Sequence, residues 1–257
     1  MAGDNELINS IDRALDILLL LQQEGKEMGV TQIGSALGIY KSTAHRTLAT
    51  LEAKGFVQQN PDNGKYWLGI RLYSLGMLIR ERLPLKNIAY PFAKELSERF
   101  DEVVHISILD KSALTYPKHI IIDKIQGRQQ VLSLTPPVGS SAACHSAAVG
   151  KCLMAFSPRS YLERFVGNPL PAFTGKTICS WDKLLAELET IRRRGYAVDD
   201  EELELGLTCV AGPILDRHAG IIAALSLSGP TTRVRARFGE IAAEVMRTTG
   251  AISSSLG

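Results

Sequence analysis

VTQIGSALGIYKSTAHRTLATLEAKGF, residues 30–56, has the pattern of two short helices joined by a tight turn. Ile33, Ala36 and Leu37 have the spacing of one buried helical face, and we expect Thr31 to cap that helix at its N-terminus. Gly38 then supplies the left-handed conformation that such a turn usually needs. The stretch therefore predicts a helix-turn-helix, the arrangement in which a protein places a helix in a DNA groove.

The second helix of this pair should run from about Lys41 to Lys54 and stop at Gly55. Apolar residues at i, i+4 and i+7 give it an inward face, so its polar and basic side chains lie on the opposite side. In a helix-turn-helix the first turns of the second helix reach base edges and phosphates. The predicted DNA-contacting residues of the two helices are Thr31, Lys41, Ser42, Thr43, His45 and Arg46.

Two strand-like runs follow at once, FVQQN at 56–60 and KYWLG at 65–69. Between them lies Pro-Asp-Asn-Gly, a turn sequence in which Asn-Gly supplies the positive φ of a hairpin bend. A helix-turn-helix followed by a small hairpin is a winged helix, and Lys65 at the tip could touch a phosphate. An ordinary amphipathic helix pair would explain the helices alone, but it would not explain the hairpin.

The segments on either side of this module are also apolar on one face. Before it, Ser10 is expected to cap a buttressing helix whose stripe is Ile11, Ala14, Leu15, Leu18 and Leu21. After it, a helix over 71–83 carries a stripe of Leu72, Leu75, Leu78 and Ile79. A small domain has already used its own core at this point, so we expect the second stripe to meet another copy of the chain. This predicts a homodimer.

Beyond Pro84 the pattern changes to period-2 segments framed by helices. A helix over 85–100 precedes VVHISILD, HIIIDKI, QQVLSL, CVAGPIL and GIIAALSLSG, and a last helix runs over about 232–253. This order predicts an α+β domain with a largely antiparallel sheet. The expected domains are a winged helix-turn-helix at 1–70, a linker helix at 71–84 and an α+β domain at 85–257. The stretch LTPPVGSSAACHSAAVGK, ending at Lys151, looks like a loop that reaches a helix N-terminus, where free N–H groups attract an anion.

Bulk composition limits the classes of protein. A formal net charge of +2 is nearly neutral, but the predicted DNA-binding region is locally basic. The four cysteines show no C-x-x-C pair and no metal-ligand spacing with histidine, so we expect free thiols, no metal and no cofactor. The longest apolar run, residues 17–21, is far too short to span a bilayer and no export signal appears. We therefore expect a cytoplasmic protein that does not bind membranes.

Strand parity in GIIAALSLSG, residues 220–229, separates two faces. Ile221, Ala223, Leu225 and Leu227 form an apolar face that belongs to the core. The other face carries Ile222, Ala224, Ser226 and Ser228, small residues that end in two hydroxyls. A ligand-facing wall and a solvent-facing surface fit this second face equally well.

Several stretches together resemble one family, the IclR-type bacterial transcriptional regulators, over nearly the whole chain. They are SIDRALDILLLL, KSTAHRTLATLEAKGFV, KYWLGIRLYSLG, HSAAVGKCLMAF, RRRGYAVDDEELELGLTCVAGPI and AALSLSGP. The resemblance implies a winged helix-turn-helix joined by a helix to an effector domain of GAF-like fold. It also implies assembly into dimers, or into dimers of dimers.

The resemblance further implies where a small molecule binds. The family's effector-contacting positions correspond here to Ala147, Ala148, Val149, Asp199, Cys209, Ser226 and Ser228. Helix N–H groups and two hydroxyls would satisfy a carboxylate, whereas Asp199 would repel it and more reasonably accepts from another group of the ligand. The alanines make this pocket less polar than in many relatives, which allows an aromatic or longer acid.

We therefore expect a DNA-binding regulator, and more specifically a repressor, that binds a double-stranded operator as a dimer. A small carboxylate or aromatic acid in the C-terminal domain would control its affinity for DNA. An alternative is a cysteine-dependent hydrolase, in which Cys209 is the nucleophile, His145 or His218 the base and Asp199 the orienting group. A third interpretation is a redox sensor that uses Cys144, Cys152 or Cys209. The sequence alone does not name the effector or the operator.

Overall fold

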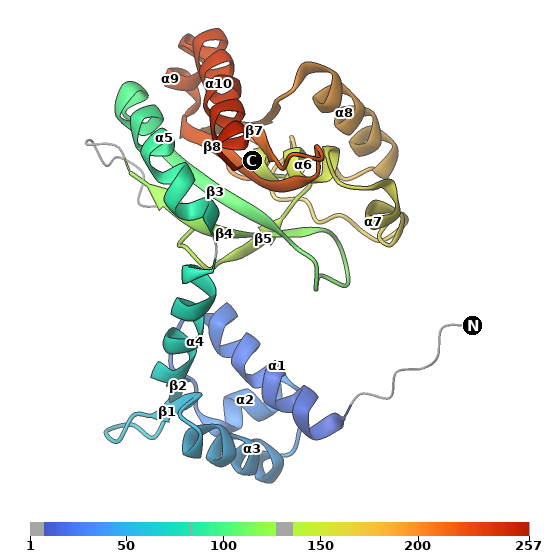
Figure 1. Ribbon diagram of the computed structural model, residues 1–257. Coiled ribbons are helices and arrows are strands. Elements are labelled where there is room, and N and C mark those ends of the chain that lie inside the picture. The colour runs from blue at the N-terminus through green and yellow to red at the C-terminus, as the bar shows by residue number, and fades with distance from the viewer. Residues whose placement is uncertain (1–7, 83, 127–135, 257) are drawn as a thin grey trace. The chain divides into compact units, whose positions relative to one another are not determined.

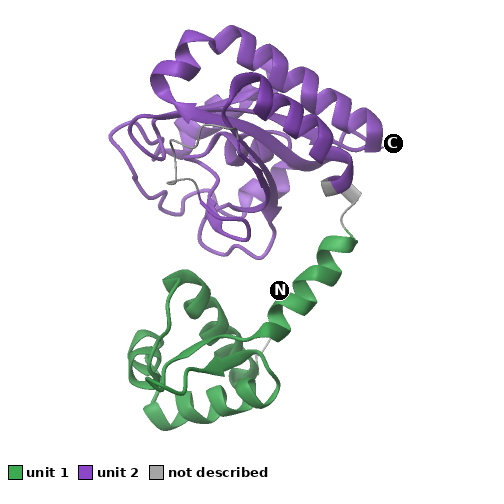
Figure 2. Cartoon of the chain, turned by 90° about the vertical axis from the view of Figure 1, so that its left-hand side faces the viewer, with its two compact units in different colours: residues 1–83 green, residues 84–257 purple. Residues whose placement is uncertain are grey.

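The computed structural model describes residues 8–82, 84–126 and 136–256 of the chain. It divides into two compact units, Met1–Leu83 and Pro84–Gly257, which Figure 2 shows in different colours. The expected strand QQVLSL lies within 127–135, outside the described residues. Each unit has a hydrophobic core of its own.

The first unit is a winged helix-turn-helix (Figure 1). Its elements are α1 (Asn9–Glu24), α2 (Val30–Ala36), α3 (Lys41–Ala53), β1 (Val57–Gln59), β2 (Tyr66–Leu68) and α4 (Ile70–Glu81). Helices α2 and α3 are joined by a turn in which Gly38 has a φ of +64°. Strands β1 and β2 pair antiparallel, and the bend between them has a positive φ at Gly64 only. The predicted winged helix is confirmed.

Two details of α1 and α2 differ from the prediction. Both helices begin earlier than expected: Ile8 is the N-cap of α1 and Gly29 that of α2, so Ser10 and Thr31 lie inside the helices. The Gln32 side chain accepts a hydrogen bond from the Gly29 backbone N–H at 2.9 Å. This bond closes the start of α2 in place of the expected Thr31 cap.

The buried face of α1 also differs. Ile17 and Leu21 are fully buried, whereas Ile11 and Leu15 are 55% and 53% exposed. Helix α1 is apolar on more than one side, so sequence periodicity alone could not select the side that packs on α3. The exposed residues leave a second apolar face on α1, formed by Ile8, Ile11, Leu15 and Leu19.

Helix α4 follows the hairpin and buries none of its residues within the chain. Ile70, Tyr73, Leu78 and Ile79 are all more than half exposed. Of the stripe predicted from the sequence, Leu75, Leu78 and Ile79 are exposed in a single copy and Leu72 is half-buried.

The second unit is built on a six-stranded sheet of order β5-β4-β3-β8-β7-β6, in which every neighbouring pair is antiparallel. The strands are β3 (Val103–Asp110), β4 (Lys118–Ile125), β5 (Ser141–Ala143), β6 (Ala197–Asp200), β7 (Leu207–Leu215) and β8 (Ile221–Pro230). Helices α5 (Pro84–Phe100), α9 (Thr231–Ala236) and α10 (Phe238–Leu256) lie on one side. Helices α6 (Ala148–Ala155), α7 (Arg159–Glu163) and α8 (Trp181–Arg194) lie on the other (Figure 1). The α+β class with a GAF-like antiparallel sheet is confirmed.

The two faces of β8 follow the predicted parity only from Ala223 onward. Ala223, Leu225 and Leu227 belong to the core beneath α5 and α10, as expected. Ile222, however, is an extra residue in the ladder, because Ala223 pairs with Ile214 while Ile221 already pairs with Leu215. This β-bulge reverses the faces of Ile221 and Ile222, a local irregularity that strict alternation cannot predict.

The last helix was expected to be continuous over 232–253 but is broken at Arg237. The short α9 packs on β7 and β8, and α10 then packs on α5 and β7. Val234 before the break is fully buried, and the Phe238 ring after it packs edge-on against Tyr196 at 6.1 Å between centroids. The break lets both apolar side chains reach the core.

Candidate DNA and effector sites

Helix α3 presents a polar face to solvent. Lys41, Ser42, His45 and Arg46 are all exposed, while Ala44, Leu48 and Leu51 are buried against the core. Thr43 is half-buried beside them, and its carbonyl oxygen accepts a hydrogen bond from Thr47 Oγ1 at 3.0 Å. Apart from Thr31 on α2 and Lys65 on the hairpin, the predicted DNA-contacting residues thus share the first two turns of α3.

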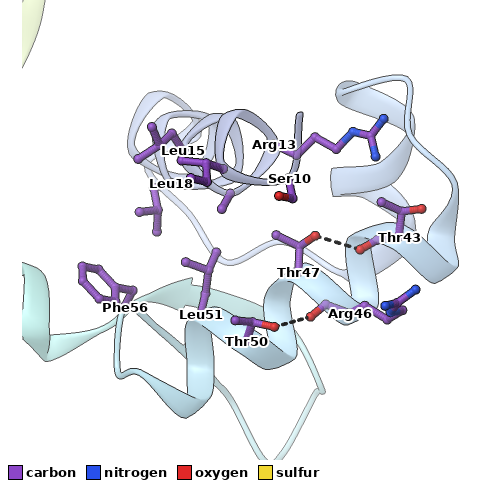
Figure 3. Close-up of a pocket in the computed structure, with 12 residues that line it drawn as sticks. Ser10, Arg13, Leu15, Leu18, Thr43, Arg46, Thr47, Thr50, Leu51 and Phe56 are labelled. Carbon is purple, nitrogen blue, oxygen red and sulfur yellow. Dashed lines mark hydrogen bonds between the residues drawn. The ribbon is translucent and has the colours of Figure 1, made fainter. Parts of the chain in front are cut away.

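A groove of about 650 Å³ runs between α1 and α3 (Figure 3). Thr43 and Arg46 lie at one end of it, with Arg13 from α1. Leu15, Leu18, Leu51 and Phe56 give it an apolar side, and the hydroxyls of Ser10, Thr47 and Thr50 also line it. Arg46 therefore lines both the exposed face of α3 and the rim of the groove.

The hairpin is held to the rest of the unit by Glu27. Its carboxylate accepts hydrogen bonds from the side-chain amides of Asn60 at 3.0 Å and Asn63 at 2.9 Å. These amides, with a smaller contribution from Lys65, lower the pKa of Glu27. Lys65 itself is exposed. The turn is therefore positioned by side-chain contacts as well as by the short β1–β2 ladder.

The second unit holds a small cavity of about 50 Å³ between the sheet and the start of α6. All seven predicted effector residues line it: Ala147, Ala148, Val149, Asp199, Cys209, Ser226 and Ser228. Ser226 and Ser228 are 3% exposed, which excludes the solvent-facing interpretation of this face of β8. The structure therefore brings together residues that are up to 81 positions apart in the sequence, from Ala147 to Ser228.

The H-x-x-x-x-G-K motif, residues 145–151, positions the start of α6. A Cβ added to Gly150 would lie 2.3 Å from the Cys144 Cα, so only glycine permits this approach. His145 Nε2 hydrogen-bonds the Pro171 carbonyl oxygen at 2.9 Å. Ala147, the N-cap residue, makes no side-chain cap, so the first N–H groups of α6 are free of a capping side chain at the cavity wall.

Behind the cavity lies a buried polar cluster of Lys151, Asp199 and Glu202. Lys151 is 1% exposed and forms an ion pair with Glu202. Asp199 Oδ1 accepts from the backbone N–H of Glu202 at 2.8 Å. Burial nevertheless raises the pKa of Asp199 to about 7. The Asp199 carboxyl is thus close to half protonated near neutrality, and when protonated it does not repel an anion as an ionised aspartate would.

Sequence reasoning missed three residues of the cavity wall: His105 and Ser107 on β3, and His119 on β4. All three are buried, and within the described part of the chain no hydrogen-bond partner is found for His105 Nε2, Ser107 Oγ or either nitrogen of His119. A buried polar group without a partner typically costs about 1–3 kcal/mol. Parity in VVHISILD places His105 and Ser107 on the face opposite Val104 and Ile106, and this signal could have found them.

The cysteine chemistry expected of a hydrolase is disfavoured by the environment of Cys209. Burial, and the adjacent Asp199 carboxylate, raise the pKa of its thiol, so the nucleophilic thiolate is suppressed. His218 is exposed on the β7–β8 turn, and His145 is bonded to Pro171; neither lines the cavity with Cys209. Burial likewise raises the pKa of Cys144 and Cys152.

Comparison with known proteins agrees with both units. The model of the IclR helix-turn-helix domain matches residues 10–61, and the model of the bacterial transcriptional regulator IclR C-terminal domain matches residues 78–254. The chain belongs to the IclR family of bacterial transcriptional regulators. It is accordingly a DNA-binding transcription regulator, which confirms the family resemblance of its motifs.

Among the relatives, the transcriptional regulator XynR of Escherichia coli is 36% identical over 89% of this chain and 88% of its own length. The acetate operon repressor of Salmonella typhimurium is 31% identical over 97% of this chain and 90% of its own. An IclR homologue of Microbacterium hydrocarbonoxydans, solved in complex with 4-hydroxybenzoate, shares the fold with a TM-score of 0.81 at 22% identity. The matched region covers 96% of this chain and 98% of the homologue's chain. Along the described residues, none of the helices has the length and hydropathy of a membrane span, and no cluster of three or more His, Cys, Asp or Glu side chains is placed to hold a metal ion.

Proposed function

We propose that this IclR-family protein is a repressor whose affinity for a palindromic operator is set by a small organic acid bound in the second unit. The observation that carries the proposal is that the seven residues expected to contact an effector line one cavity. The same cavity wall includes the start of α6 and two serines, and such groups suit a carboxylate. Repression is the role printed in the name of the Salmonella relative.

The DNA-binding half of the proposal rests on the exposed face of α3. Lys41 and Arg46 are placed to contact phosphates and base edges, with Ser42, Thr43 and His45 beside them. Thr31 at the start of α2 and Lys65 on the hairpin would contact the backbone on either side of the groove. A regulator that binds chromosomal DNA acts in the cytoplasm, where we place this protein.

We assign the uncovered apolar faces of α1 and α4 to a homodimer. Ile70, Tyr73, Leu78 and Ile79 of α4 are too extensively apolar for a solvated helix, and two copies of α3 are what a palindromic site requires. Leu78→Glu should shift sedimentation of the protein toward a monomer. Leu114→Glu, at an exposed leucine of the second unit, is the matched control and should leave the oligomer intact. A wild-type chain that sediments as a monomer at micromolar concentration would overturn the dimer.

The test of the whole proposal combines binding of acid and of DNA. Duplexes selected from a random library by the wild-type protein supply the operator, and a panel of short carboxylic acids is screened by thermal unfolding. An acid at about 100 times its Kd should stabilise the second unit by about 2.7 kcal/mol. The same acid should change operator affinity by about 5- to 150-fold, the usual range of allosteric coupling. An acid that stabilises the protein without changing operator affinity would refute control by that acid.

A further inference from the structure

The cavity of the second unit has one wall that the proposed carboxylate site does not use. His105 and Ser107 on β3 and His119 on β4 line it, across from the start of α6. Their exposed fractions are 6%, 0% and 3%. Among the described residues, four of their polar atoms have no hydrogen-bond partner. The wall is therefore built from polar side chains that the rest of the protein leaves available to a ligand.

These side chains are neutral in the ligand-free protein. Burial lowers the pKa of His119 to about 4, and burial with the charge of Lys124 lowers the pKa of His105 to about 3. A neutral imidazole carries one donor and one acceptor nitrogen, and a serine hydroxyl also donates and accepts. A group that does both, such as an alcohol, can pair with a donor and an acceptor of this wall at once. A carboxylate only accepts, so it would leave the acceptor nitrogens unpaired.

We propose that the effector is a short hydroxy acid whose hydroxyl is bound by His105, Ser107 and His119. This assignment rests on the proposed effector function and specifies its ligand. The carboxylate would lie toward the α6 start, near Ser226 and Ser228, and the hydroxyl at the β3–β4 wall. In the sheet, Ser226 is the register partner of His105, so the two polar ends of the site are neighbours.

The size of the cavity favours a short acid over an aromatic one. Its volume of about 50 Å³ corresponds to roughly four water molecules at about 10–15 Å³ each. A four-carbon hydroxy acid and a benzoate both exceed this volume, so the walls must separate to admit either ligand, and they must separate further for the benzoate. The cavity therefore favours a compact aliphatic ligand over a bulky ring.

Matched four-carbon acids test the assignment by calorimetry on the full chain. Butanoate is compared with 2-, 3- and 4-hydroxybutanoate, and with succinate as the dicarboxylate of equal length. The best hydroxy acid should bind at least about tenfold more tightly than butanoate, equivalent to about 1.4 kcal/mol. Equal affinity of butanoate and all three hydroxy acids, or tightest binding of succinate, would overturn the hydroxyl site while leaving the effector cavity in place. Failure of these acids, and of every acid in the thermal-unfolding panel, to bind would overturn both proposals.

Variants test whether the preference for a hydroxy acid comes from the side chains of the β3–β4 wall. His119→Leu and Ser107→Ala should each reduce the preference for the hydroxy acid to less than about threefold, with little change for butanoate. Ser226→Ala, at the carboxylate end, should weaken the hydroxy acid and butanoate by the same factor. Without ligand, His119→Leu should unfold at a higher temperature than the wild type, since it removes a buried group without a partner. A lower melting temperature combined with an unchanged hydroxyl preference would show that His119 is structural.

Discussion

The two candidate sites use polar side chains in opposite ways. On α3, Lys41, Ser42 and Arg46 are solvated, so their polarity costs the fold little and is available to DNA by simple contact. In the cavity, His105, His119 and Asp199 are buried, and burial has moved the pKa of each. The exposed face of α3 can therefore change with little effect on the fold, whereas the proposed effector cavity and the stability of its unit are physically coupled.

The largest expected effect tests whether the exposed side chains of α3 contact DNA. Lys41→Ala combined with Arg46→Ala should weaken operator binding about 30-fold or more, since two lost contacts to base edges carry about 1–3 kcal/mol each. The slope of log K against log salt should become shallower by about 1 for each phosphate that the variant no longer neutralises. Fluorescence anisotropy at several salt concentrations measures both quantities.

The same double variant should unfold within about 0.5 kcal/mol of the wild type, because both side chains are exposed. Lys183→Ala, at an exposed lysine of α8, is the matched control and should leave operator affinity unchanged. If the double variant bound its operator with wild-type affinity and salt slope, α3 would not be the helix that contacts the DNA bases.

The second prediction concerns the packing of α6. Gly150→Ala should destabilise the second unit by about 3 kcal/mol or more, since the new Cβ would lie 2.3 Å from the Cys144 Cα. The first unit should keep its own melting transition, which calorimetry separates. Gly239→Ala, where no atom lies within 4 Å of the added Cβ, is the control and should be nearly neutral. Neutrality of Gly150→Ala would contradict the close approach.

How much of this could be predicted from sequence differs between the sites. Helix period and turn chemistry were enough to predict α3 and its exposed polar face, because that face is what Ala44, Leu48 and Leu51 leave exposed. The cavity required the family resemblance, since Ala147, Asp199 and Ser228 meet only in the folded sheet. Strict alternation failed at the Ile222 bulge, and a similar irregularity between Ile106 and Ser107 in the β3–β4 ladder hid the relation of His119 to His105. Bulges depend on ladder pairing that the local sequence does not record.

A third prediction follows from the raised pKa of Asp199. A carboxyl whose pKa is about 7 in the folded chain and 3.8 in the unfolded chain favours the folded state below pH 3.8, and this contribution is lost as pH rises through 7. Asp199→Asn should therefore gain stability relative to the wild type by about 2–3 kcal/mol between pH 5 and 8. Urea unfolding of both proteins across this range measures the difference. A stability difference that does not change with pH would show that the pKa of Asp199 is not raised in the folded chain.

His105 and His119 should give the opposite pH dependence. Their pKa values are lowered in the folded chain, so their contribution is present above the ordinary histidine pKa of 6.5 and is lost as pH falls toward 4 and 3. In the wild type, this loss of stability on acidification opposes the stability that is gained as Asp199 becomes protonated. The Asp199→Asn variant should therefore lose stability more steeply than the wild type on acidification from pH 6.5, which the same urea series records.

The smallest expected effect concerns the hairpin. Lys65→Ala should weaken operator binding only about two- to fivefold and reduce the salt slope by about 1, as for a single phosphate contact. Glu27→Gln should have an effect of similar size, since it weakens the hydrogen bonds that hold Asn60 and Asn63 without removing a positive charge. It should leave the salt slope unchanged, and a reduced slope for Glu27→Gln would contradict a purely positioning role.

The close approach of Gly150 to Cys144 limits how the proposed effector site could be re-engineered as a biosensor. Helix α6 already lies against the preceding backbone, so its start cannot move deeper to tighten the cavity around a smaller analyte. Room for a bulkier analyte must come from trimming side chains on the strands, with the helix left in place. Directed evolution toward new inducers should accordingly accumulate substitutions on β3, β4 and β8, and should leave position 150 untouched.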